Sequence, residues 1–527
     1  MAVSLVSTGI TFPDATTQTT AAFPGGTRTF TTSGTVSAAG LPIALNTDGT
    51  VSTVSNVAAA TSGANVSGYT VDSFNAGNTT LYIAATNTFV VSFITNTTLF
   101  VRAGTLSGST ITWGTAVSVS AANYASFTLD EASNSCLAVY RTGGALYAKV
   151  ITISGTTCTA QAQVTIDSGS VINIQNVFSV YDNISGKHVV ACQDVSASEA
   201  YSIYTWVATV SGNTSTYVAK GYIFGNNATL TGANANNAFG ATTDRAGTIV
   251  FWAVGNGTFV NSTNCMIQIG TISGTTLTVG TNSSMTFTSS ISAAVISYNP
   301  AYAVFTLMII SSTNLYSALI TTNATTRTWS AVTGITSGST AWVNQLSGNN
   351  TAVSQGIALS YDFTANKIIL VFRRQSDGTV YAVPGQITAN VVSGTRSLVF
   401  EGSASWTTVV SGTAYTSTNS IAYSSSAGKI VYIVGVGASG WSWAVSTTPY
   451  STNKNFIGVS TASAASGASL SCTIIGGVNT NVTGLVTGSN YYASSTGTIT
   501  ISPSSATLVG RALSATSLLV TQGLATI

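Results

Sequence analysis

The chain has few side chains that could do acid–base or metal chemistry. Its 527 residues include one histidine, His188, which follows Lys187 at the start of an apolar segment. A serine or cysteine nucleophile needs a base within hydrogen-bond distance, yet we expect His188 to be a half-exposed strand residue. The five cysteines lack the short spacings of zinc sites or disulfide frameworks. We therefore expect reduced thiols in strands, no metal site and no cofactor.

Acidic residues recur at one position of a repeated turn, at Asp130, Asp182, Asp244 and Asp362. Glycoside hydrolysis requires two carboxylates about 5 to 9.5 Å apart, and equivalent turns of separate repeats lie too far apart for that. An Asp in a tight turn accepts hydrogen bonds from backbone amides two residues further on, and we expect this local role. The segment SDGTVY (376–381) resembles a sialidase Asp-box only superficially, because the spacing of its residues is too short. We predict that the protein is not an enzyme.

A second set of polar residues lies eleven positions after three of these aspartates, where the following strand ends. The set comprises Arg141, Gln193 and Arg373, with Asp194 and Arg374 directly after and Tyr140 and Phe372 directly before. Planar hydrogen-bond donors beside aromatic faces suit a sugar, whose hydroxyls accept hydrogen bonds while its ring stacks. We expect these seven residues to form a rim that binds a glycan or another receptor. The alternative is that they only solvate the strand ends.

The repeat that carries these residues is an apolar strand, a short turn and a second apolar strand. Clear copies read FSVYDNISGKHVVAC (178–192), IALSYDFTANKIILVF (357–372) and SIAYSSSAGKIVYIV (420–434). Seven turn markers lie roughly 45 to 63 residues apart: Ala85, Asp130, Asp182, Asp244, Asn299, Asp362 and Ser424. A period near 50 with only strand-like content indicates a radial array of β-sheets, with four strands to a blade. We predict an all-β fold built on a seven-bladed β-propeller.

The repeats divide the chain into four parts. We expect residues 1–30 to be an N-terminal anchoring segment and residues 31–65 to be a β-hairpin linker that turns on Asp48-Gly49. The propeller is predicted over 66–450 and a small C-terminal β domain over 451–527.

Composition limits the partners of such a protein. Charged residues make up 5% of the chain and the net charge is +2, whereas about 25% charged residues is usual. The surface is therefore solvated by hydroxyls and amides, and it lacks the basic groove that nucleic acids require. A membrane-spanning helix needs about 20 mostly apolar residues, and residues 302–310 form a run only about half that long, so we expect no membrane insertion. The first residues also lack the basic and apolar regions of a signal peptide.

The segment GITFPDATTQTTAA (9–22) resembles GITFPDGTxQTTAA, an N-terminal motif of tailed-phage virion structural proteins, especially tail-fibre and appendage proteins of marine phages and cyanophages. Ala15 departs from the glycine of that motif. Near the other end, GGVNTNVTGLVTGSNYY (476–492) and VGRALSATSLLV (509–520) resemble a C-terminal β module of similar proteins. The resemblance implies a virion appendage that is structural and binds a receptor on the host surface. It also implies a location on the tail or capsid, after assembly in the host cytoplasm.

The same resemblance implies how the protein is attached. The N-terminal residues Ile10, Phe12, Pro13 and Asp14 would dock on other virion proteins, because so short a segment cannot bury its own apolar side chains. The implied partners are these virion proteins, a host cell-surface glycan or protein, and further copies of the chain, a trimer being the expectation for a fibre. Two alternatives remain open: a capsid or tail decoration protein without receptor binding, and a polysaccharide-degrading tailspike.

Overall fold

The computed structural model describes residues 4–6, 9–11, 17–18, 26–46, 49–57, 60–66, 80–130, 133–168, 174–194, 203–224, 239–244, 246–254, 264–286, 291–311, 314–331, 343–344, 353–363, 365–374, 378–389, 396–400, 407–410, 419–435, 441–447, 450–451, 456–494, 497–501 and 507–521. Regular structure in these ranges consists of β-strands and one short 3-10 turn, η1 (Ala84–Thr86). No helix of the described ranges is long and apolar enough to cross a membrane. The predicted all-β class is confirmed.

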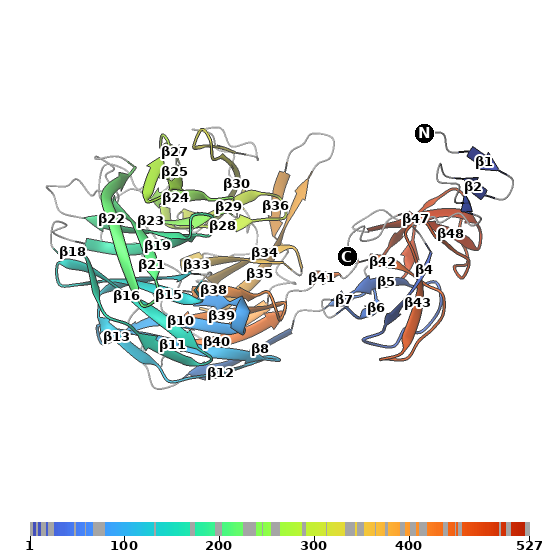
Figure 1. Cartoon of the computed structure of the whole chain (residues 1–527), viewed down its shortest axis with the longest axis horizontal. Helices are drawn as coiled ribbons and strands as arrows, with labels where there is room; N and C mark the ends of the chain where they lie inside the picture. The colour runs from blue at the N-terminus through green and yellow to red at the C-terminus, as the bar shows by residue number, and fades with distance from the viewer. Residues whose placement is uncertain are drawn as a thin grey trace. The chain divides into compact units, whose positions relative to one another are not determined.

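Seven antiparallel sheets, the blades of a propeller, lie within residues 59–448 (Figure 1). Blade 1 contains β9 (Thr80–Ile83), β10 (Thr88–Thr95), β11 (Thr98–Ser107), β12 (Thr110–Trp113) and β13 (Val117–Ala121). Blade 2 contains β14 (Tyr124–Asp130), β15 (Ser135–Thr142), β16 (Ala145–Ser154), β17 (Thr157–Ala160) and β18 (Val164–Asp167). Blade 3 contains β19 (Ile174–Asp182), β20 (Lys187–Asp194), β21 (Ile203–Ser211) and β22 (Thr214–Ile223).

The next three blades have the same arrangement as the first three, in which the first four strands pair in sequence order. Blade 4 contains β23 (Phe239–Thr243), β24 (Thr248–Val254), β25 (Asn264–Ser273), β26 (Thr276–Val279) and β27 (Ser283–Thr286). Blade 5 contains β28 (Ile291–Asn299), β29 (Val304–Ser311), β30 (Asn314–Asn323), β31 (Thr328–Ala331) and β32 (Val343–Asn344). Blade 6 contains β33 (Val353–Asp362), β34 (Lys367–Arg374), β35 (Val380–Ala389), β36 (Arg396–Phe400) and β37 (Thr407–Val410). In the five-stranded blades the fifth strand pairs with the third.

Blade 7 closes the propeller with a strand from the other end of the repeat region. It contains β38 (Asn419–Ser424), β39 (Lys429–Gly435) and β40 (Trp441–Thr447), and its fourth strand is β8 (Ala60–Val66). Figure 1 shows β8 beside β40, with Ala60 paired to Thr447 and Val66 to Trp441. The innermost strands contact one another in a closed circle, β9–β14–β19–β23–β28–β33–β38–β9. The prediction of a seven-bladed β-propeller is therefore confirmed, and residues 60–66 belong to the propeller rather than to a linker.

The second strand of a blade is buried on both faces because a neighbouring blade packs on each side. All eight residues of β10 and all seven of β24 are buried. A strand in this position contains a continuous apolar run instead of alternating apolar and polar residues. Between blades 4 and 5, for example, Val250, Ile267 and Leu307 belong to one buried cluster. The apolar runs of the repeat are thus the cores of the blade interfaces.

The remaining residues form a separate compact unit from both chain ends, Met1–Ala58 and Pro449–Ile527. One sheet has the order β4 (Thr27–Thr31), β43 (Ser469–Ile474), β42 (Phe456–Ser460), β5 (Pro42–Leu45) and β6 (Val51–Thr53). A second has the order β44 (Val478–Asn479), β48 (Ser517–Val520), β47 (Thr507–Ser514), β45 (Asn490–Ala493) and β46 (Ile499–Thr500). Two further small sheets are β7 (Asn56–Val57) with β41 (Tyr450–Ser451), and β1 (Ser4–Val6), β2 (Gly9–Thr11) and β3 (Thr17–Gln18).

This shared unit differs from the predicted division into anchor, linker and C-terminal domain. The expected hairpin around Asp48-Gly49 exists as β5 and β6, but β5 pairs with β42 from the C-terminal part. The physical reason is burial: the hairpin alone would expose Ala44, which here packs in one cluster with Phe456 and Val459. Of the expected anchoring residues, Ile10 lies in β2, whereas Phe12, Pro13 and Asp14 lie outside the described residues.

Candidate functional site: the mouth of the central channel

A tight turn joins the first and second strands of every blade, and all seven turns lie at the same end of the propeller, here called the turn end. In five blades an Asp or Asn side chain accepts hydrogen bonds from backbone amides of its own turn, and in blade 7 Ser424 does so. Asp244 Oδ1, for instance, accepts from Ala246 N and Thr248 N, both at 2.8 Å. The predicted local role of the turn aspartates is confirmed.

The first blade departs from this pattern. In blade 1 the last residue of the first strand is Ile83, which pairs with Thr88. Asp182 has the same position in blade 3. The turn marker expected at Ala85 therefore lies two residues after the true equivalent position. The turn of blade 1 uses the 3-10 turn η1 instead of a side-chain acceptor. Each of the seven turns nevertheless ends on a residue with positive φ, which favours Gly or Asn: Asn87, Asn134, Gly186, Gly247, Ala303, Asn366 and Gly428.

Directly before the turn residue, each innermost strand contributes one side chain to a set that we call the mouth positions. These are Tyr82, Leu129, Tyr181, Thr243, Tyr298, Tyr361 and Tyr423. Five of the seven are tyrosines. Because the innermost strands surround the channel of the propeller, this repetition places tyrosines around the channel at one level near the turn end.

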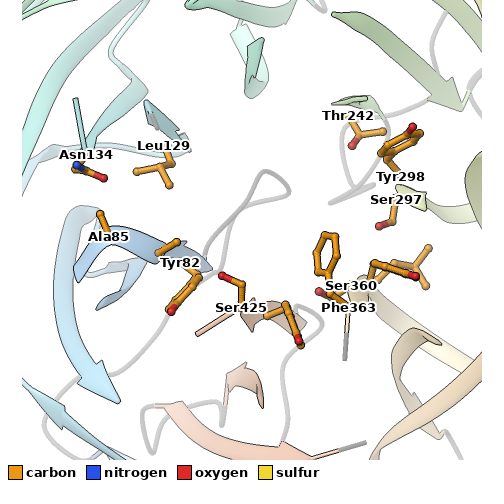
Figure 2. A pocket seen from close by; sticks show the side chains of 14 residues that line it. Tyr82, Ala85, Leu129, Asn134, Thr242, Ser297, Tyr298, Ser360, Phe363 and Ser425 are labelled. Carbon is orange, nitrogen blue, oxygen red and sulfur yellow. The ribbon is translucent and has the colours of Figure 1, made fainter. Parts of the chain in front are cut away.

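A cavity of about 630 Å³ opens at this level. Figure 2 shows its lining side chains around an open space, with Tyr82 and Ser425 on one side and Tyr298 and Phe363 on another. The lining also includes hydroxyls of Thr242, and of Ser297 and Ser360, which directly precede two mouth tyrosines. A neighbouring cavity of about 640 Å³ shares several of these residues. Ligand sites commonly measure about 300–1,000 Å³ and are concave in this way.

Aromatic contacts hold part of the lining in place. The Phe363 ring, in the turn of blade 6, makes an edge contact with Tyr361, with ring centroids 4.9 Å apart and planes at 83°. Its centroid also lies 5.5 Å from that of Tyr423 in blade 7. Phe363 is nevertheless 46% exposed. Two blades therefore present an accessible aromatic surface supported by packed tyrosines.

Hydrogen bonds join blades 1 and 7 at the same level. The Tyr82 hydroxyl lies 2.6 Å from Ser426 Oγ and donates to Asn87 Oδ1 at 3.1 Å. Ser426 Oγ also donates to Asn87 Oδ1, at 3.2 Å. In blade 6, the Tyr361 hydroxyl donates to Asn366 Oδ1. The left-handed asparagines of these turns thus orient two of the mouth tyrosines.

The electrostatics of the cavity are simple. None of the 14 described residues that line it is Asp, Glu, Lys, Arg or His. Burial raises the pKa of Tyr361, which keeps its hydroxyl neutral. The neighbouring cavity includes one acidic residue, Asp244, whose carboxylate accepts the two turn amides described above. The described lining of the first cavity therefore holds aromatic faces and neutral hydroxyls but no carboxylate, imidazole, amine or guanidinium group.

The single histidine lies in the blade interface, not at the surface. His188 is 0% exposed, which corrects the expectation of a half-exposed residue. Its Nδ1 lies 2.9 Å from Thr128 Oγ1 of blade 2, and its ring lies 4.8 Å from that of Tyr181. Burial lowers the pKa of His188 to about 4, so the imidazole is neutral near pH 7. Blade 2 covers one face of β20 and blade 4 covers the other, which strand periodicity alone does not reveal.

The predicted binding rim lies at the opposite end of the propeller, where the second strands end. In blade 3, Asp182 pairs with Lys187 at the turn end, and Asp194 pairs with Ile174 at the far end. Four of the seven rim residues have buried side chains, which corrects the expectation of an exposed rim at these positions: Tyr140, Gln193, Asp194 and Phe372. The physical reason is that adjacent blades pack against the second strand up to its last residues.

Contacts within the blades account for most of these side chains. The Tyr140 hydroxyl donates to Gln163 Oε1 at 2.7 Å, and Gln193 Oε1 accepts from Asn176 Nδ2 at 3.2 Å. The three arginines are half-buried. Arg141 Nε donates to Gly143 O at 2.8 Å.

Arg374 is also held inside its own blade. Its Nη2 donates to Tyr381 Oη at 2.7 Å, and its guanidinium carbon lies 4.7 Å from the centre of that ring. Arg373, in β34, lies one position earlier and pairs with Ser354 and Val380. The structure therefore places the predicted rim residues at one level in three blades but does not gather them into one site.

No group of three or more His, Cys, Asp or Glu side chains is arranged to hold a metal ion within the described ranges. The five cysteines are free, buried and within strands, as predicted. Burial raises the pKa of Cys158 to about 11, so its thiol is unreactive near neutral pH.

The sequence carries a signal for the mouth that lies outside the charged and metal-binding motifs. A tyrosine precedes the turn residue in VYD, SYN, SYD and AYS, and the same position is Tyr82 in blade 1. Aligning the repeats on their turns, instead of searching for charged pairs, would have found it.

Comparisons with known proteins find similarity only among solved structures, at low sequence identity. A scan against protein-family models and a search of curated proteins gave no match. Among solved structures, a protein from Lactobacillus plantarum is similar over 66% of this chain and 88% of its own, with 11% identity and a TM-score of 0.43. A putative 6-phosphogluconolactonase from Bacteroides uniformis is similar over 62% and 84%, with 10% identity and a TM-score of 0.41. An α-L-arabinanase from Penicillium chrysogenum, complexed with arabinobiose, is similar over 59% and 89%, with 13% identity and a TM-score of 0.36.

Proposed function

We propose that this chain is a phage virion appendage protein of the tail-fibre type, in which the propeller contacts the host surface and the shared β unit attaches to the particle. The observation that carries the proposal is the connection between the two units. The chain enters the propeller at Ala60 and leaves it at Thr447, which pair with each other in the outer strands of blade 7. Both chain connections to the attachment unit therefore leave from blade 7, and the other six blades have no direct connection to it.

The N-terminal motif supports the virion assignment, since GITFPDATTQTTAA resembles the motif of phage appendage proteins. The partners that follow are other virion proteins, through the segment with Ile10, Phe12, Pro13 and Asp14, and a host cell-surface glycan or protein. Several copies on one particle, a trimer being the fibre expectation, would convert weak single contacts into firm attachment. Assembly in the host cytoplasm agrees with five buried free thiols.

We propose binding rather than catalysis as the activity. The mouth cavity has no charged group among its described lining residues. A polysaccharide-degrading tailspike would need two carboxylates at its site, and the described lining of the mouth cavity holds none.

The test is competition for adsorption. Cells of the strain on which the phage grows are incubated with the purified full chain, washed, and challenged with phage. We expect bound protein on the cells and slower adsorption, and immunogold labelling at the distal end of an appendage. Full-rate adsorption with no bound protein would refute host attachment and favour the decoration alternative. New reducing ends released from host polysaccharide would favour the tailspike alternative.

A further inference from the structure

The mouth cavity combines three features that together restrict the chemistry of a ligand. The first is an aromatic platform. Phe363 is 46% exposed although hydroxyl and amide side chains dominate the sequence outside the apolar runs, and it is fixed against Tyr361 and Tyr423. An aromatic side chain that stays accessible at the edge of a cavity offers its face to the apolar face of a ligand.

The second feature is a set of hydroxyl side chains in the lining of the same cavity. Thr242, Ser297 and Ser360 line the cavity beside the mouth tyrosines, and Ser425 lines it from the turn of blade 7. A hydroxyl both donates and accepts hydrogen bonds, so these groups match a ligand that carries many hydroxyls of its own. The Tyr82–Asn87–Ser426 contacts hold one side of the mouth in a defined geometry before any ligand binds.

The third feature is the uncharged lining. A phosphate, carboxylate or sulfate ligand would lose its hydration here and find no arginine or lysine among the described lining residues. A cationic ligand would find no carboxylate among the same residues, and the Asp244 carboxylate of the neighbouring cavity already accepts two turn amides. The described lining therefore favours a neutral ligand with both hydroxyls and an apolar face, which is the surface of a neutral hexose.

From these features we propose that the channel mouth at the turn end binds a neutral saccharide, with Phe363 as the stacking platform. The proposal deepens the proposed function by naming the ligand class of the host-binding head. It replaces the rim predicted from sequence, whose members are mostly buried, with a site at the other end of the propeller.

The experiment uses the full chain and polysaccharide released from the host envelope by mild acid, separated by ion exchange into neutral and anionic fractions. Binding is measured by saturation-transfer NMR and by calorimetry at low and high salt. We expect the neutral fraction to bind with an affinity that does not depend on salt. Loss of one aromatic contact is worth about 0.5–1.5 kcal/mol, so Phe363→Ala should weaken binding by roughly twofold to twelvefold.

Tyr222→Ala is the matched control, because Tyr222 is also exposed (41%) but lies on β22 at the outer edge of blade 3. We expect this variant to bind as the wild type does. Equal weakening by both substitutions, unchanged binding by Phe363→Ala, or preference for the anionic fraction would each overturn the mouth site.

The two proposals fail differently. If the wild-type protein binds host cells but does not bind the neutral fraction, the saccharide site is refuted and host attachment is still supported. Protein that binds the neutral fraction but neither coats the cells nor slows adsorption would support the site and refute the attachment role.

Discussion

The buried histidine makes the stability of the propeller depend on pH in a way that can be isolated. Desolvation lowers the pKa of His188 from 6.5 to about 4, while the nearby Asp130 carboxylate acts in the opposite direction. The value of 6.5 describes the unfolded chain and the value of about 4 the folded chain. At a pH between them, His188 binds a proton in the unfolded chain but not in the folded chain. The contribution of His188 to stability is therefore complete above pH 6.5 and is lost as the pH falls toward 4.

The size of the effect follows from the difference of about 2.5 between the two pKa values. At about 1.4 kcal/mol for each pKa unit, it amounts to ~3 kcal/mol. The chain has one histidine, so His188→Gln removes the only imidazole and leaves the carboxylates unchanged. Subtracting the pH dependence of the variant from that of the wild type cancels their common contribution.

The assay is urea unfolding of the propeller transition at a series of pH values between 4 and 7.5, for both proteins. We expect the free energy of unfolding of the wild type to fall by ~3 kcal/mol more than that of His188→Gln over this range. The single imidazole Hε1 resonance gives an independent NMR titration of the folded protein. A folded-state pKa near 6.5, or two parallel pH profiles, would refute the burial argument.

Two further predictions concern contacts that repeat around the propeller. Asp244→Ala removes a side chain that accepts hydrogen bonds from two amides at 2.8 Å, and it should lower the free energy of unfolding by about 1–3 kcal/mol. Asp244→Asn is the control, because it keeps an acceptor oxygen. An equal loss of stability in both variants would show that the charge matters more than the hydrogen bonds. Gly114→Ala should shift the unfolding midpoint clearly downward, because its Cβ would lie 1.9 Å from Thr156 O in the next blade, whereas a Cβ at Gly144 meets nothing within 4 Å. Equal shifts for Gly114→Ala and Gly144→Ala, measured by thermal unfolding, would contradict this close approach.

The sequence by itself determined the features that are local. The turn after each innermost strand is set by neighbouring residues, so Asp182 and Asp362 could be assigned to backbone amides before any coordinates were known. The apolar runs marked the strands, and their period indicated seven blades. Scattered cysteines within those runs could likewise be predicted to be buried and free.

The tertiary structure alone decided the features that depend on contacts between distant parts of the chain. Ala60 pairs with Thr447 to close the propeller, and Phe456 of β42 pairs with Ala44 of the hairpin strand β5. Such pairings are selected by which apolar faces remain uncovered once the blades have formed, and no local pattern encodes that. Burial of His188 and of the predicted rim followed from the packing of neighbouring blades. The mouth exists for the same reason, because contacts such as that between Tyr82 and Ser426, 344 residues apart, form only when the circle of blades closes.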